Sequence, residues 1–93
     1  MNDLNYYKNE LKKGLNISQV IKQINKNAKI KIAEINKIKK TQLNKVKLLP
    51  KNEWQDQSKV IKDGAINAIN EITDISNKLI EAIKEFNKTV KVA

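Results

Sequence analysis

Apolar residues recur along this chain at the three- and four-residue spacing of α-helices, and only two residues interrupt the pattern. Gly14 ends the first periodic stretch, and Pro50 ends the second because it disfavours helical geometry in the residue before it. The pattern therefore predicts three helices and one corner: helices over residues 3–13, 17–48 and 53–90, and a corner at 47–52. No strand pattern competes, because alternation of apolar and polar residues never persists.

Residues with a helix-capping spacing precede each predicted helix. A short polar side chain at the cap accepts a backbone N–H of the first turn, and a Gln three residues later can bond back to the cap. The candidates are Asn2 or Asp3 for the first helix, Asn16 with Gln19 for the second, and Asn52 with Gln55 for the third. Gly64 lies inside the third periodic stretch, and we expect it to remain helical at a cost of ~1 kcal/mol.

The third predicted helix carries the most regular pattern, eight apolar residues spaced alternately by four and three. We call them the assembly seam: Ile61, Ala65, Ala68, Ile72, Ile75, Leu79, Ala82 and Phe86. Such heptads are typical of a helix that packs along another helix. More apolar residues flank the seam, with Ile69, Ile83 and Val90 on one side and Ile66 and Ile80 on the other. Because one partner helix cannot cover so wide a face, we expect a three- or four-helix arrangement.

The second predicted helix is less regular, because Lys31, Gln42 and Lys45 occupy positions where its heptads call for apolar residues.

The three predicted helices together indicate an all-α fold of one small domain, residues 1–93. In this fold a short N-terminal helix accompanies two long helices, which form a coiled-coil-like antiparallel hairpin packed in an oligomer or larger assembly. An extended rod bent at Pro50 would satisfy the same local signals.

The composition removes most catalytic chemistry. The 93 residues include no Cys, His or Arg, so thiolate and imidazole metal sites and Cys- or His-based nucleophiles are excluded. The three Ser residues have no base to activate them, and two Gly residues cannot build a phosphate-cradling loop. We expect a protein that is not an enzyme and uses no cofactor, metal or small-molecule substrate.

Positive charge is concentrated in the first half of the chain. Residues 1–52 hold 13 Lys and three acidic residues, a net charge of +10, whereas residues 53–93 hold six Lys and seven acidic residues, a net charge of −1. The predicted face for a nucleic acid or an acidic partner, which we call the lysine face, consists of Lys22, Lys26, Lys29, Lys37, Lys40 and Lys47. Guanine is usually recognised by Arg through two hydrogen bonds, whereas Lys mainly supplies a point charge. Contact of this face with nucleic acid would therefore tolerate many base sequences. A solvated face enriched in Lys by an AT-rich genome explains the array equally well.

The spacing of the apolar residues also predicts where Tyr6, Tyr7 and Trp54 lie in the three-helix fold. Tyr7 falls on the apolar side of the first helix and Tyr6 points outward. Trp54 lies just past the corner, where it closes the end of the bundle over Leu48, Leu49 or the N-terminal helix. It is also a candidate partner anchor, because Trp is enriched at interface hot spots.

A helical hairpin of about this length with a Trp beside its turn resembles the small WXG100-type substrates of type VII secretion. The corresponding residues here are Trp54, Gln55 and Asp56, with Asp where that family has Gly, and the family's C-terminal Tyr-x-x-x-Asp/Glu signal is missing. The resemblance implies a secreted helical hairpin that binds a partner of similar size.

These patterns together favour a structural or assembly protein, such as a portal- or capsid-associated component of a phage virion. Its partner is then a second copy of itself or a larger assembly, with nucleic acid or an acidic protein surface against the lysine face. The alternatives are a sequence-nonspecific nucleic-acid-binding protein and the WXG100-like hairpin. No apolar run is long enough to span a membrane or form a signal peptide, so we expect a cytoplasmic location or one within a virus particle.

Overall fold

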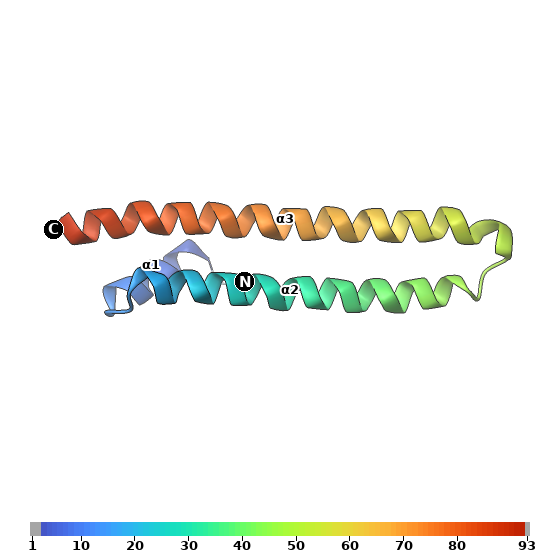
Figure 1. Cartoon of the computed structure of the whole chain (residues 1–93), viewed down its shortest axis with the longest axis horizontal. Coiled ribbons are helices and arrows are strands. Elements are labelled where there is room, and N and C mark those ends of the chain that lie inside the picture. Colours follow the sequence, from blue (N-terminus) through green and yellow to red (C-terminus); the bar gives the residue numbers. More distant parts are fainter. Residues whose placement is uncertain (1–2, 93) are drawn as a thin grey trace.

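The computed structural model describes residues 3–92 and consists of three α-helices. They are α1 (Leu4–Lys12), α2 (Ile17–Val46) and α3 (Lys51–Val92). The two long helices run antiparallel side by side, and α1 packs against them at the end far from the corner (Figure 1). The expected all-α hairpin is confirmed, and the extended rod is not what forms. The molecule is nevertheless elongated, with extents of 64 × 16 × 16 Å.

The expected capping interactions form at the first two helices. Asp3 caps α1 by accepting the backbone N–H of Tyr6 at 3.0 Å. Asn16 and Gln19 form a reciprocal capping box at the start of α2, with bonds of 2.9 and 3.1 Å. Between these helices Gly14 adopts a φ of 111°, a left-handed conformation that suits a residue without Cβ.

The corner departs from the prediction at the start of the third helix. α3 begins at Lys51, and the carbonyl of Pro50 accepts the N–H of Glu53 at 2.9 Å. Asn52 therefore lies inside the first turn, and its predicted role as the cap was wrong. The fixed φ of Pro suits a position at a helix start, so the helix begins directly after it.

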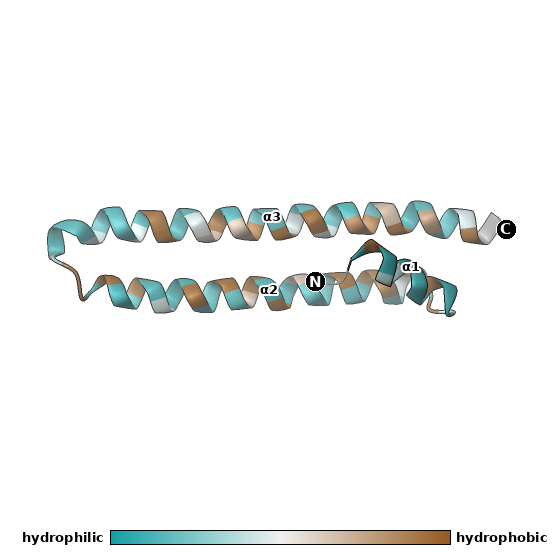
Figure 2. Cartoon of the chain, turned by 180° about the vertical axis from the view of Figure 1, so that it is seen from behind, coloured by the Kyte–Doolittle hydropathy of each residue, from teal (hydrophilic) through white to brown (hydrophobic). Residues whose placement is uncertain are grey.

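Apolar residues recur along all three helices (Figure 2), but the best-buried of them gather at the end of the hairpin where α1 packs. Tyr7 and Leu11 of α1 form a cluster with Val20, Ile24 and Ile83 of the long helices. The inward position of Tyr7 and the outward position of Tyr6 are as expected. This cluster holds the short helix and both long helices together.

The rotation of α3 about its axis differs from a simple reading of the heptads. Ile83 is fully buried although it flanks the seam, and its heptad equivalent Ser76 is buried as well, at 4% exposure. Ile75, which belongs to the seam, is 45% exposed. The line of closest contact with α2 is therefore displaced toward the flank that carries Ile69 and Ile83, and this displacement leaves part of the seam facing outward.

Candidate functional site

The candidate site is a trough, which we define as the groove between α2 and α3 on the face of the hairpin where α1 lies. α1 fills one end of it, where the side-chain amide of Asn27 donates a hydrogen bond to the Tyr7 hydroxyl at 3.0 Å. Four residues follow Asn27 on the same side of α2, at steps of about four, seven, four and three residues: Lys31, Ile38, Gln42 and Lys45. The last three of them line the trough beyond α1.

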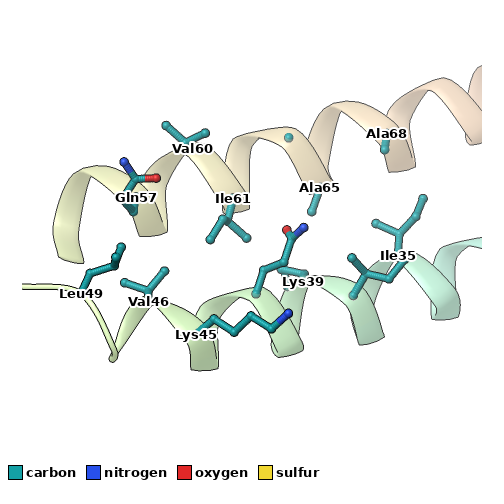
Figure 3. A pocket seen from close by; sticks show the side chains of 13 residues that line it. Ile35, Lys39, Lys45, Val46, Leu49, Gln57, Val60, Ile61, Ala65 and Ala68 are labelled. Atoms are coloured by element: carbon teal, nitrogen blue, oxygen red, sulfur yellow. The ribbon is translucent and has the colours of Figure 1, made fainter. Parts of the chain in front are cut away.

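We call the part that α1 leaves uncovered the open trough, a groove of about 680 Å³ (Figure 3). Its lining comes from both long helices and the corner: Ile35, Ile38, Lys39, Gln42, Lys45, Val46, Leu49, Gln57, Val60, Ile61, Gly64, Ala65 and Ala68. Val46 and Ile61 point toward each other across it, and small residues on α3 widen it (Figure 3). The arrangement is a shallow apolar groove between two helices.

The open trough leaves large apolar side chains in contact with water. Ile38 is 56% exposed and Val60 is 65% exposed, and among the lining residues only Val46 and Ala65 are buried. A contiguous exposed apolar patch of this kind is typical of a binding surface.

The assembly seam contributes to two different contacts. Its members at seven-residue steps from Ile61 lie on the trough side, where Ile61 and Ala68 line the groove and Ile75 is exposed. The others are Ala65, Ile72, Leu79 and Phe86, which are buried or half-buried. Leu79 and Phe86 pack against the cluster beneath α1. Leu79 and Phe86 of the seam are therefore used within the chain, whereas Ile61, Ala65 and Ala68 line the open trough.

The charged residues that line the open trough are all basic. Lys39 and Lys45 come from α2, and no carboxylate is among the lining residues. Lys39 is half-buried and Lys45 is exposed, and both line the groove from α2. The α2 edge therefore carries positive charge, whereas the α3 edge contributes the neutral Gln57, Val60 and Gly64.

The lysine face lies on a different side of α2. All six of its members are exposed, and the 100° turn per residue places them within about 80° of arc, on the side directed away from α3. They extend over about 37 Å of the helix axis. Within residues 3–92 none of the six takes part in an ion pair. The predicted lysines thus share one side of α2, separate from the open trough.

Trp54 has a structural position at the corner. Its indole N–H donates to the carbonyl of Leu49 at 2.7 Å, and the ammonium of Lys51 lies 6.0 Å from the ring. The predicted alternative in which Trp54 contacts the N-terminal helix is wrong, because α1 packs at the opposite end of the hairpin. The half-buried ring leaves its role as a partner anchor a prediction.

Sequence reasoning missed the open trough as a site. The heptads show that the apolar face of the third helix is too wide for one partner, but not where the surplus emerges. The available signal is length, because the nine residues of α1 can cover less than a third of the 30-residue α2.

No protein-family model, curated protein or solved structure matches this chain. Within residues 3–92, neither long helix has an apolar stretch sufficient to cross a bilayer. The acidic side chains of the same residues do not gather into a group that would hold a metal ion.

Proposed function

We propose that this chain is a non-enzymatic helical assembly protein, which joins another protein through the open trough. The observation that carries the proposal is the exposure of apolar residues along this trough, next to a length of the same groove that α1 already fills. The lysine face, on another side of the hairpin, is then available for an anionic surface.

The energetic argument rests on the residues left exposed. Full burial of an Ile or Val side chain stabilises a complex by about 1.5–3 kcal/mol. Ile38 and Val60 retain more than half of their exposure in the free chain, and Leu49 retains 40%. A partner that covers these three residues therefore gains several kcal/mol of apolar burial, enough to offset part of the cost of association.

Photo-crosslinking in the cells that naturally produce the chain tests this proposal. A photoreactive residue in place of Val60 should give discrete adducts, with a second copy or with another protein, and Ile38→Asn should reduce them. The control places the same residue at Ile66, which is 55% exposed but does not line the trough. Equal crosslinking at the two positions, or none at either, would contradict an assembly role for the trough.

A second role, sequence-nonspecific binding of nucleic acid, is favoured by the lysine face. Its six ammonium groups, which form no ion pair with the residues that the structure describes, extend over about 37 Å, and a phosphate backbone can neutralise them with release of counterions. Such binding weakens steeply with salt and is similar for all base sequences.

Titration of a mixed-sequence DNA duplex by fluorescence anisotropy, at about 50 and 200 mM salt, tests this role. Replacement of Lys22, Lys26 and Lys29 by Gln should lower the slope of log K against log salt by ~2–3. The matched control replaces Lys59, Lys62 and Lys84 of α3, which changes the net charge equally. If both triple variants weaken binding to the same extent, the attraction is due to net charge and the lysine face has no special role.

A further inference from the structure

We propose that the partner in the open trough is an amphipathic helix that carries Asp and Glu along its edge nearest α2. This inference rests on the proposed assembly function and adds the chemistry of the partner. Two features of the chain carry it: the way α1 occupies the same trough, and the sign of the charge along the α2 edge.

The intramolecular contact of α1 shows what the trough accepts. α1 is a nine-residue amphipathic helix whose Tyr7 and Leu11 are buried between α2 and α3, with Leu4 packed beside them. Since Ile38, Gln42 and Lys45 continue the side of α2 that holds Tyr7 through Asn27, the open trough is a continuation of the same surface. From Ile35 to Leu49 it extends for about 21 Å, which accommodates a helix of about 14 residues. Such a helix completes a three-helix cross-section like the one at the α1 end.

Charge decides which helix fits. Lys39 and Lys45 line the open trough from α2, and no acidic residue among the lining residues neutralises them. In the covered part the basic residues of the short helix lie on the α3 side, where the ammonium groups of Lys8 and Lys12 are 5.3 and 5.9 Å from the ring of Phe86. A partner helix with carboxylates toward α2 would satisfy the two lysines, whereas a basic edge would be repelled.

A second copy of the chain fits this surface less well. α1 projects from the trough face, so a two-fold pair that lays trough on trough must place the two copies of α1 at opposite ends. In that arrangement α2 packs on α2, and Lys39 and Lys45 of each copy face a basic helix. Each chain also carries a net charge of +9. Like charges at the edge of an interface oppose such pairing.

The test uses two stapled, fluorescently labelled peptides of about 14 residues that share the same Leu positions. One carries Glu along the edge intended for α2 and the other carries Lys there. Anisotropy titrations on the full chain should give an affinity for the Glu peptide at least about tenfold higher than for the Lys peptide. Ile38→Asn combined with Val60→Asn should weaken binding of the Glu peptide about tenfold, and Ile66→Asn should change it less than about twofold.

A charge reversal distinguishes recognition of the peptide's charge from nonspecific apolar binding. Lys39→Glu with Lys45→Glu should invert the order of the two peptides, and Lys59→Glu with Lys62→Glu, which changes the net charge equally, should not. Equal affinity for both peptides, or an order that either pair inverts to the same extent, would overturn the inference. Sedimentation of the free chain as a dimer that Ile38→Asn with Val60→Asn dissociates would also overturn it. In each of these cases, stronger crosslinking at Val60 than at Ile66 would still support the proposed assembly function. Loss of that difference would contradict the assembly function itself.

Discussion

The two halves of the hairpin are built from the same two helices, yet they bury apolar surface to very different extents. In the covered half, four side chains reach complete or nearly complete burial: Tyr7, Val20, Ile24 and Ile83. In the open half, beyond α1, the buried apolar residues are Val46 and Ala65, and several large apolar residues remain exposed. The long helices contact each other in both halves. The difference in burial therefore comes from α1, which is present only in the covered half.

This comparison shows that two antiparallel helices bury only a strip of each other's surface. A third helix is needed to cover the groove between them, and α1 has only nine residues with which to do it. The open half therefore resembles a bundle from which one helix has been removed. Four sets of substitutions test this comparison, in order of decreasing expected effect.

The largest effect should come from the same change made in each half. Ile24→Ala removes a fully buried side chain in the covered half and should lower the free energy of unfolding by about 2–5 kcal/mol. Ile61→Ala removes a half-buried one in the open half and should cost about 1 kcal/mol. Urea unfolding followed by far-UV circular dichroism measures both. Equal costs would mean that the two halves are packed alike.

Tyr7→Phe tests the polar link between α1 and α2. Loss of the hydrogen bond from Asn27 should lower the unfolding free energy by about 1 kcal/mol. Tyr6→Phe makes the same chemical change on the exposed neighbouring ring and should have no measurable effect. If both variants unfold like the parent chain in urea, the link does not hold α1 in place.

Gly64→Ala should stabilise the open half. A Cβ at this helical position meets no other side chain and no atom of α2 within 4 Å, and Ala is favoured over Gly in a helix by about 0.8–1 kcal/mol. A rise in the urea midpoint would agree with open space at Gly64. A fall would show that the two helices approach more closely there than the structure indicates.

Trp54→Phe should have the smallest effect. It keeps an aromatic ring at the corner and removes the indole N–H that bonds to the carbonyl of Leu49, at a cost of about 0.5 kcal/mol. Thermal unfolding measured by circular dichroism is the readout. A loss as large as that of Ile24→Ala would place the main determinant of the fold at the corner and not beneath α1.

Local sequence signals predicted most of the fold. Gly14 and Pro50 marked the interruptions, Asn16 and Gln19 marked a helix start, and the spacing of Tyr7 marked it as buried. Each of these features depends on a few neighbouring residues, so it can be predicted from the sequence alone. The start of α3 at Lys51 was missed because the Asn52 spacing resembled a cap, whereas Pro50 already placed the helix start.

The rotation of the long helices could not be predicted in the same way. An apolar face that contains both Ile75 and Ile83 allows several lines of contact, and the regular heptad favoured the one through Ile75. In the folded chain Ile83 joins the buried cluster of α1 and α2 residues instead, and Ile75 remains exposed. The position of the open trough follows from this choice, which depends on contacts between residues far apart in the sequence. The lysine face was predictable as a set, because it requires only that α2 be a helix.

Residue-resolved amide hydrogen exchange of the free chain tests the central claim most directly. If the open half lacks a covering helix, amides of residues 39–43 and 61–65 should exchange through local opening at least about tenfold faster than those of residues 20–24 and 79–83. Addition of the acidic peptide should slow exchange in the open half and leave the covered half unchanged. Equal protection in the two halves of the free chain would contradict the account, because it would mean that the hairpin is complete without a partner.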